Sequence, residues 1–306
     1  MTKPYSLAIY SLWTPDTAAG ILSSFQMMGW GLRREFSKLG HVDLRYDAHG
    51  DGPVTVKQAD FTLVHNLFMQ PIYNQLAEIR EKTKHKISVI QEIPYPSPLI
   101  DRCFTFLPTP WPDRSILQLP WPEVEQVTLP CVRELLEPTA HFTKARGSVL
   151  LDHGWIENGV QTDWLPQLYG WLQHRMQNTP VAQLRRERCE KAAPPTWVKP
   201  IAECGYPTYL ALTADFEWFV VTHPGSYEHS IIDMAARGIR VLVPTLNGRP
   251  FCNQSIIDDL GLRTFSTEAE LCNLLDNLPP VPKLDKLNDM PDIVAKLDNY
   301  YQENLA

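Results

Sequence analysis

Two series of short apolar runs alternate with helical patterns along the chain, and this alternation constrains the fold more than any other feature of the sequence. In the first half, the strand-like runs are residues 6–10, 41–46, 61–65 and 87–91. Helical periodicity fills residues 18–39 and 71–82 between them. A chain that alternates strands and helices in this way is expected to form a parallel sheet with helices on both faces.

The second half repeats the alternation. Strands are predicted at residues 148–152, 218–222 and 239–244. Helices are predicted at residues 163–176, 181–191, 208–215, 226–237, 254–260, 267–277 and 284–303. A segment rich in proline and tryptophan, residues 94–130, interrupts the alternation and predicts short strands and rigid loops. We therefore expect two doubly wound α/β domains, residues 1–142 and 143–306, with the last helix a candidate to cross back to the first.

Composition narrows the classes of function. The 306 residues are enough for two buried cores, and the formal net charge of −7 argues against a broad electrostatic footprint for nucleic acid, leaving a local basic face open. No apolar run approaches the roughly 20 residues that span a bilayer, so no membrane partner is expected. The six scattered cysteines contain no C-x-x-C pair, which is typical of a cytoplasmic protein with reduced thiols and no zinc site.

The strand, turn and helix predicted within residues 218–244 carry the clearest chemical signal. The turn consists of His223, Pro224, Gly225 and Ser226, and Tyr227, at the start of the helix, is a further candidate donor contact. The backbone of the turn can approach a ligand closely, and the start of the helix that follows attracts a diphosphate. Asp233, about two turns into that helix, is placed to accept hydrogen bonds from both hydroxyls of a nucleotide ribose. The same residues also fit a plain helix cap with Asp233 on a solvated face.

Several motifs are absent. The sequence has no D-x-D triplet, so we expect no metal ion in donor binding, and it has neither a G-x-G-x-x-G turn nor a phosphate-binding Walker loop. A G-x-S-x-G nucleophile motif is also missing. These absences weigh against dinucleotide oxidoreductases, nucleoside triphosphatases and serine hydrolases.

The run D-M-A-A-R-G-I-R-V-L-V-P, residues 233–244, resembles the E-A-M-A-x-G-x-P-V-V pattern of GT-B glycosyltransferases. The resemblance extends over most of the C-terminal half, and residues 18–44 look like the opening of that family. It implies two Rossmann-like domains facing a central cleft and assigns the donor ribose to Asp233, which is one methylene shorter than the usual Glu. The upstream Glu of the E-x7-E form is absent, because Gly225 stands at that position.

A narrower resemblance links residues 85–98, H-K-I-S-V-I-Q-E-I-P-Y-P-S-P, to the DNA β-glucosyltransferases of T-even phages, and residues 251–275 are also similar. It implies inverting transfer from UDP-glucose or a similar donor to a 5-hydroxymethylpyrimidine in double-stranded phage DNA, in the host cytoplasm. Glu92 matches the catalytic base of that family. The arginines that hold the diphosphate there have no counterpart in residues 153–159. Phosphate contacts are then expected from backbone groups, from Arg249, or from Arg185, Arg186 and Arg188.

The remaining candidate site residues are chosen by their places at the ends of predicted strands and in the loops that follow them. Glu92 comes directly after a predicted strand, where a carboxylate points into the crevice that binds ligands in such sheets, although it equally fits a cap of the proline-rich loop. Asp16 is a second candidate base, and Gly154 a further donor contact. His65, Asn66 and Trp111 are expected to line the acceptor site, with hydrophobic packing as the alternative for Trp111. No tightly bound cofactor is expected.

Two other functions stay open at this stage. One is a bacterial-type glycosyltransferase that acts on a glycan, a lipid-linked sugar or a small molecule. The other is a protein that binds a nucleotide sugar without catalysis. An inverting glycosyltransferase is the leading expectation.

Overall fold

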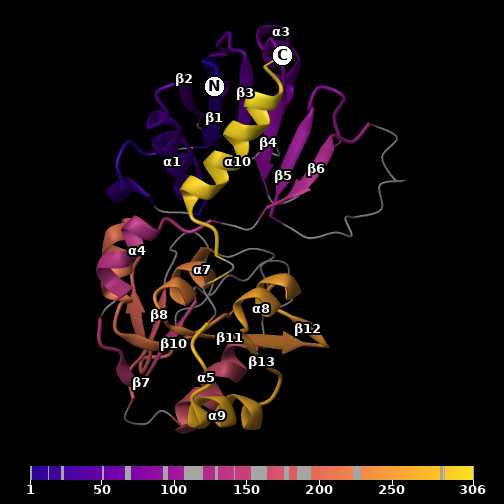
Figure 1. Cartoon of the computed structure of the whole chain (residues 1–306). Helices are drawn as coiled ribbons and strands as arrows, with labels where there is room; N and C mark the ends of the chain where they lie inside the picture. Colours follow the sequence, from indigo (N-terminus) through magenta and orange to yellow (C-terminus); the bar gives the residue numbers. More distant parts are fainter. Residues whose placement is uncertain are drawn as a thin grey trace. The chain divides into compact units, whose positions relative to one another are not determined.

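The computed structural model describes residues 2–305 except for 13, 22–23, 50–51, 66–69, 92–95, 107–119, 128–129, 141, 153–163, 176–178, 185–193, 223–228, 283–284 and 286. The chain forms two compact units. Unit 1 comprises residues 1–132 and 288–306, and unit 2 comprises residues 133–287 (Figure 1).

Unit 1 is built on a six-stranded sheet in which every neighbouring pair is parallel. Its strands are β1 (Tyr5–Leu12), β2 (Val42–His49), β3 (Phe61–His65), β4 (Ile87–Gln91), β5 (Arg102–Thr105) and β6 (Glu123–Gln126), in the order β2-β1-β3-β4-β5-β6. Its helices are η1 (Ala18–Gly20), α1 (Ser24–Ser37), α2 (Gln70–Asn74), α3 (Leu76–Lys82) and α10 (Met290–Glu303).

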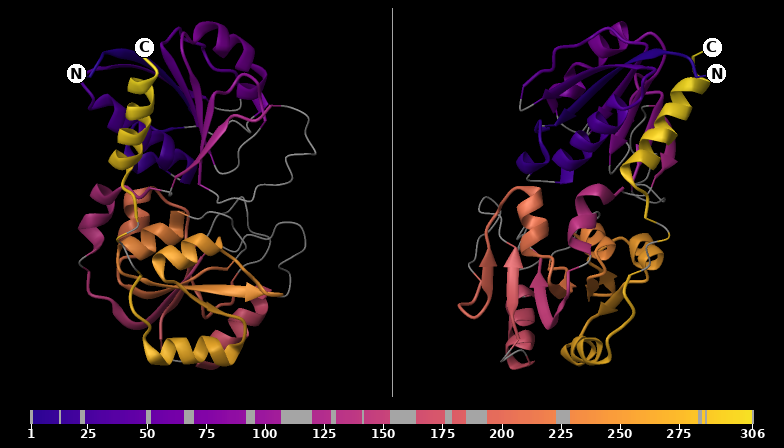
Figure 2. Two further views of the ribbon diagram at one scale, coloured as in Figure 1. Left: turned by 45° about the vertical axis from the view of Figure 1, so that its right-hand side comes forward. Right: turned by 60° about the vertical axis from the view of Figure 1, so that its left-hand side comes forward.

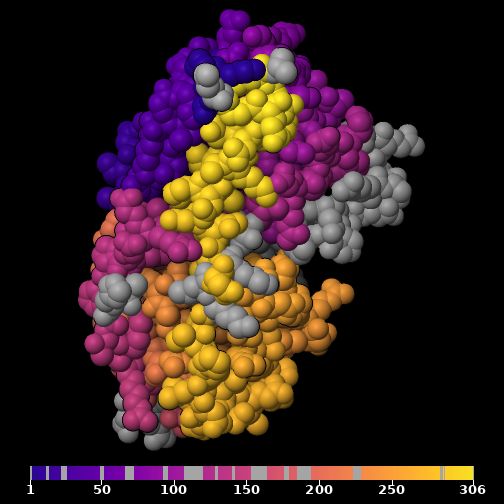
Figure 3. Space-filling view, viewed as in Figure 1, coloured from indigo at the N-terminus to yellow at the C-terminus, as the bar shows by residue number. Residues whose placement is uncertain are grey.

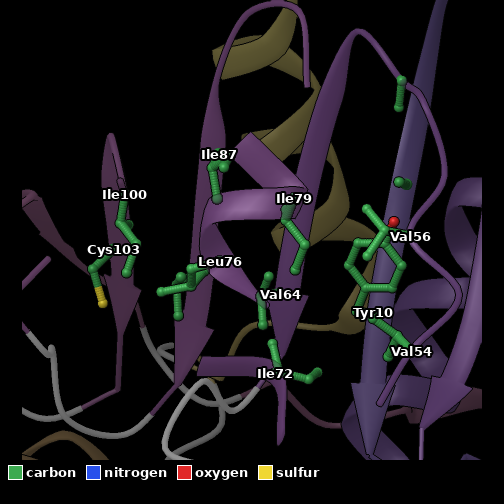
Figure 4. Close-up of a cluster of buried hydrophobic side chains, with 13 residues drawn as sticks. Tyr10, Val54, Val56, Val64, Ile72, Leu76, Ile79, Ile87, Ile100 and Cys103 are labelled. Carbon is green, nitrogen blue, oxygen red and sulfur yellow. The ribbon is translucent and has the colours of Figure 1, made fainter. Parts of the chain in front are cut away.

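The two faces of this sheet are covered by different helices. On one face, Ile72 of α2 and Leu76 and Ile79 of α3 pack onto Val64 and Ile87 of the sheet (Figure 4). Helices α1 and α10 pack together on the other face (Figure 2). Both faces are therefore apolar, which explains why β3 and β4 are buried along their whole lengths.

Helix α10 reaches unit 1 because its inner side is apolar and its tyrosines find partners in the sheet. The Tyr301 ring is completely buried against Phe61, with ring centroids 4.8 Å apart, and its hydroxyl lies 2.6 Å from the Ser88 hydroxyl. At the rim, Asp298 accepts a hydrogen bond of 2.8 Å from the Tyr5 hydroxyl. The outer side of α10 is exposed along the surface of unit 1 (Figure 3).

Unit 2 contains a second, mostly parallel sheet. Its strands are β7 (Ala145–Leu151), β8 (Val181–Leu184), β9 (Lys199–Ile201), β10 (Phe216–Val220), β11 (Arg240–Leu246), β12 (Arg249–Pro250) and β13 (Arg263–Phe265). The parallel strands run in the order β9-β8-β7-β10-β11-β13, and β12 folds back antiparallel to β11. The helices are α4 (Arg133–Ala140), α5 (Trp164–Arg175), α6 (Tyr206–Leu212), α7 (His229–Ala236), α8 (Gln254–Leu260) and α9 (Glu268–Asn277).

The predicted fold class, two doubly wound α/β domains with parallel sheets, is confirmed. The units differ from a division at residue 142 in two places. Helix α4 lies in unit 2, where it packs against α6 and α7, and α10 lies in unit 1. In both cases the contacts of an amphipathic helix, rather than its place in the sequence, decide which unit it joins.

Two element predictions are corrected. Residues 181–184 of the segment predicted as a helix form strand β8, because Val181 and Ala182 are buried beside β7, where Val181 pairs with Val149. Residues 185–191 lie outside the described residues. The last helix begins at Met290 rather than at residue 284. Asp289 caps it, and Asp292 completes a capping box.

Candidate functional site

The carboxyl edge of the unit 2 sheet has a topological switch point between β7 and β10. From β7 the strand order runs one way to β8 and β9, and the other way to β10, β11 and β13. In open α/β sheets, ligands bind outside the carboxyl ends of the strands at such a point. Residues 153–163 come after Asp152, which directly follows β7, and residues 223–228 come after Thr222, two residues beyond β10. Both loops that the sequence assigns to the donor therefore leave the sheet at this point.

Asp152, the buried residue directly after β7, lies at the switch point and is a further candidate that sequence pattern alone does not mark. Its backbone N–H donates to Val220 of β10 at 3.0 Å, and its carboxylate Oδ2 accepts from the Ser230 hydroxyl of α7 at 3.4 Å. Its carbonyl accepts from Gln183 of β8 at 3.3 Å, and Gln183 in turn accepts from Tyr169 of α5 at 2.5 Å. The signal in the sequence is a single acid directly after the apolar run of β7.

Helix α7 and the residue that directly follows it carry a buried polar stripe, which we define as His229, Asp233 and Arg237. The spacing of four residues places them on one side of the helix, and all three are at most 6% exposed. The apolar residues Ile231, Ile232, Met234 and Ala235 are buried as well, so the helix is enclosed. The burial of Asp233 excludes the alternative that it lies on a solvated face.

Asp233 lies beside the hydroxyl of Tyr206, the first residue of α6, and near the guanidinium of Arg237. Burial raises the pKa of its carboxyl to about 7, and the Tyr206 hydroxyl and the Arg237 charge oppose that rise. Arg237 itself donates to the carbonyls of Asp233 and Leu210 and to the Thr213 hydroxyl, at 3.2, 2.9 and 3.0 Å. The positive charge of Arg237 thus stabilises the ionised carboxylate of Asp233, although the guanidinium donates its hydrogen bonds to neutral groups.

The structure describes only one of the other residues predicted to bind the donor, Arg249. The residues His223, Pro224, Gly225, Ser226 and Tyr227 and the loop residue Gly154 lie outside the described residues. Arg249 is exposed in β12, directly after a tight turn in which Asn247 and Gly248 both have positive φ. Because β11 runs parallel to β10, this turn emerges at the same carboxyl edge as the switch point.

Unit 1 has a switch point of its own, between β1 and β3. Neighbouring strands end there in buried polar residues: Ser11, His65, Gln91 and Thr105. The predicted acceptor residue His65 lies with its Nδ1 2.9 Å from the Ser11 hydroxyl, which accepts a hydrogen bond of 3.1 Å from Thr14. Glu92 follows Gln91 directly, but Glu92, Asn66 and Trp111 lie outside the described residues.

Helix α1 packs tightly over this polar group because residue 29 is glycine. A Cβ atom there would lie 2.0 Å from the Ser11 hydroxyl oxygen and 2.3 Å from that of Thr14. We expect Gly29→Ala to destabilise the protein by about 1–3 kcal/mol, because the overlap outweighs the usual helical preference for alanine. In the matched variant Gly170→Ala, in α5, no atom lies within 4 Å of the added carbon, and we expect a gain of about 0.5–1 kcal/mol. Urea denaturation measures both, and equal effects would contradict this account of Gly29.

Asp16, the second candidate base, is exposed in the segment after β1. Its carboxylate forms an ion pair of 2.8 Å with Arg33 of α1, and the Arg33 guanidinium lies 4.9 Å from the centre of the Tyr46 ring. To act as a base, Asp16 would have to leave this pair, so its role stays a prediction of lower weight than that of Glu92.

Among the described residues, no group of three or more His, Cys, Asp or Glu side chains is arranged to hold a metal ion. No helix among them has both the length and the apolar character needed to cross a membrane.

Comparisons with known proteins find similarity in structure alone. No family model and no curated protein sequence matches the chain. A UDP-GlcNAc 2-epimerase from Methanocaldococcus jannaschii, in complex with UDP-GlcNAc and UDP, aligns with a TM-score of 0.60 and 8% identity over 96% of this chain and 99% of that chain. Trehalose-6-phosphate synthase OtsA gives 0.57 and 10% over 97% of each chain. The fold is GT-B.

A third structure with the GT-B fold is an α-glucosyltransferase in complex with UDP and a 13-mer DNA containing an HMU base. It aligns with a TM-score of 0.54 and 12% identity over 98% of this chain and 92% of that chain. At these identities the likeness concerns the fold. The three structures combine different chemistries on that fold, so the activity has to be argued from the residues of this chain.

Proposed function

We propose that the protein is a glycosyltransferase that takes its sugar from a nucleotide-diphosphate donor bound by unit 2. The observation that carries the proposal is the switch point between β7 and β10, from which both predicted donor loops leave and beside which α7 begins. The proposal is further supported by the UDP or UDP-sugar named for two of the similar structures. UDP-glucose or a similar nucleotide sugar is the proposed donor.

Each donor contact has a chemical reason. The amides of residues 223–227 and the start of α7 would hold the diphosphate, because unpaired N–H groups and the helix dipole attract anions. Asp233 would accept hydrogen bonds from the ribose hydroxyls, and Gly154 and Arg249 would complete the phosphate site. Such positive groups matter most in the transition state, when negative charge grows on the departing diphosphate. Donor binding would then need no divalent metal ion.

The acceptor would bind at the carboxyl edge of unit 1. Glu92 would take the proton from the acceptor hydroxyl as that oxygen attacks the anomeric carbon, so the configuration at that carbon inverts. His65, Asn66 and Trp111 would line the site, and Asp16 remains the alternative base. A 5-hydroxymethylpyrimidine in DNA is the proposed acceptor, because residues 85–98 resemble a phage DNA glucosyltransferase and one similar structure holds DNA with an HMU base.

Mass spectrometry of nucleosides tests the proposal directly. DNA that carries hydroxymethylcytosine or hydroxymethyluracil is incubated with the protein and a pool of nucleotide sugars, and is then digested. A hexose- or pentose-sized mass gain that Asp233→Asn lowers or abolishes is the expected result. If neither base gains mass, the DNA acceptor is wrong, and glycans and small molecules become the acceptors to test.

Two controls separate the alternatives. UDP-GlcNAc incubated without acceptor should remain unchanged, whereas its conversion to an epimer would point to the chemistry named for the archaeal neighbour. Donor binding without turnover on any acceptor, unaffected by Glu92→Gln, would indicate a non-catalytic binding protein. A steep loss of acceptor binding with added salt is expected for DNA and not for a small neutral acceptor.

A further inference from the structure

Helix α7 and the start of α6 enclose two polar atoms that lack hydrogen bonds. Within the described part of the chain, Oδ1 of Asp233 and the hydroxyl of Tyr206 are buried and have no partner in good hydrogen-bond geometry, although the two side chains lie close enough to shift each other's pKa. Buried polar groups are nearly always satisfied in folded proteins. Two neighbouring buried groups without hydrogen-bond partners therefore indicate a site whose hydrogen bonds are completed when a ligand binds.

The neighbours of this pair do not complete it. Arg237 donates hydrogen bonds to the carbonyls of Asp233 and Leu210 and to the hydroxyl of Thr213. Tyr209 of α6 places its ring 5.8 Å from the Tyr206 ring and 5.8 Å from the Arg237 guanidinium. Arg237 thus contributes charge, and Tyr206 is the neighbour whose hydroxyl faces the carboxyl.

Other charged groups near α7 are exposed or have other partners. Lys144, which lies near Arg237, donates to the carbonyl of Ala214 at 2.5 Å. Helix α4 carries Glu134 and Glu137, and both are exposed. In β11, Arg240 pairs with Glu217 of β10 at 3.3 Å. His229, one turn before Asp233 on the same helix, is the remaining titratable group of the polar stripe. The ionisation of Asp233 is therefore governed locally, by burial against the opposing effects of Tyr206 and Arg237.

We propose that Tyr206 is a positioning residue, which donates a hydrogen bond to one oxygen of Asp233 and so presents the ionised carboxylate to the ribose hydroxyls of the donor. This inference rests on the proposed function, since it takes Asp233 as the ribose contact. Only an ionised carboxylate accepts from both hydroxyls without a proton of its own in the way. The free site holds much of its Asp233 protonated near neutral pH, so donor binding must release a proton.

Removing the Tyr206 hydroxyl should make that proton harder to release. In Tyr206→Phe the carboxylate loses the neighbouring hydroxyl that stabilises its ionised form, and we expect the pKa of Asp233 to rise by about one unit. At pH 6, binding of UDP-glucose should weaken by up to about tenfold, because the ionised fraction falls by that factor. Tyr209→Phe is the matched control, since it removes a hydroxyl from the same helix.

Calorimetric titration of UDP-glucose at pH 7, in two buffers with different ionisation enthalpies, counts the protons released on binding. A nucleotide sugar suits this count, because its diphosphate does not titrate near neutral pH. We expect about half a proton for the unchanged protein and for Tyr209→Phe, and nearly one proton for Tyr206→Phe. Binding with equal proton release by the unchanged protein and Tyr206→Phe would overturn the inference while leaving the donor site in place.

A second measurement separates this inference from the proposed function. The carboxyl ¹³C signal of Asp233, assigned by its loss in Asp233→Asn, is titrated in the free protein and in Tyr206→Phe. An unchanged midpoint overturns the role of Tyr206 whatever the ligand. If neither UDP-glucose nor GDP- or ADP-glucose binds, the proposed function fails and the ribose part of this inference fails with it, even where the ¹³C midpoint shifts.

Discussion

Replacing Asp233 by asparagine is expected to weaken the binding of UDP-glucose by about 10- to 100-fold. Hydrogen bonds to a charged group contribute about 1.5–3 kcal/mol, and the amide of asparagine offers only one oxygen to the two ribose hydroxyls. Calorimetric titration at pH 8, where the carboxylate is mostly ionised, gives the largest contrast. Unchanged affinity in Asp233→Asn would remove Asp233 from the donor site.

Asp233→Asn is expected to weaken donor binding but to stabilise the folded protein at neutral pH relative to the unchanged chain. The pKa of Asp233 is raised to about 7 in the folded chain from an ordinary value of 3.8, so the folded state holds a proton that the unfolded state releases. The stabilisation from that proton is present at low pH and is lost as the pH rises from about 4 to about 7. The loss amounts to roughly 1.4 kcal/mol per pH unit, or about 4 kcal/mol in total.

Asp233→Asn removes this dependence, because asparagine does not titrate. We therefore expect the unfolding free energy of Asp233→Asn, relative to the unchanged protein, to rise with pH between about 5 and 6.5 and to level off above pH 8. Urea denaturation at a series of pH values measures the difference. The control is Asp285→Asn at an exposed position, for which the difference should stay flat. A flat line for Asp233→Asn as well would contradict the raised pKa.

Truncating Tyr301 is expected to have the largest effect on folding itself. Its ring is completely buried in unit 1, within 6.4 Å of the rings of Phe36, Phe61 and Tyr5, and its hydroxyl meets Ser88. We expect Tyr301→Ala to cost about 3–5 kcal/mol, since a large cavity opens and a buried serine loses a partner. Tyr301→Phe should cost about 1–3 kcal/mol, from the hydrogen bond alone.

Hydrogen exchange localises the damage of Tyr301→Ala. Amides of β1, β3 and β4, the strands beneath α10, should lose protection, while those of unit 2 should keep theirs. Asn299→Ala changes an exposed residue of the same helix and serves as the control. Equal loss of protection in both units would mean that α10 supports the whole chain rather than unit 1.

The sequence was most informative where local pattern and burial agree. Strands β3 and β4 are buried throughout because both faces of the sheet are covered, and the predicted boundaries of these strands match the structure. The prediction for residues 181–184 was wrong because four residues are too few to show a period, and their pairing with β7 depends on contacts far along the chain. The start of α10 was misplaced because the cap at Asp289 was overlooked.

The candidate site was only partly predictable for the same reason. A motif placed Asp233 on α7, but its enclosure by Tyr206 and Arg237 depends on how α6 packs against α7, which no local pattern records. The four-residue spacing of His229, Asp233 and Arg237 is the one local signal that these polar residues share a side of the helix. Asp152 needed the strand order, because a lone acid after a strand gains meaning only when that strand lies at a switch point.

Helix α10 affects the order in which the two units can finish folding during synthesis. Lys3 and Gln302 exchange two hydrogen bonds of 2.9 Å, so segments almost 300 positions apart are neighbours in unit 1. On the ribosome, all of unit 2 emerges before the helix that covers the aromatic face of the first sheet. The part of the protein synthesised first is therefore the last to be completed. Until α10 is available, Phe61 and Tyr5 form an exposed aromatic surface that is prone to aggregation, and the nascent chain or a chaperone has to cover it.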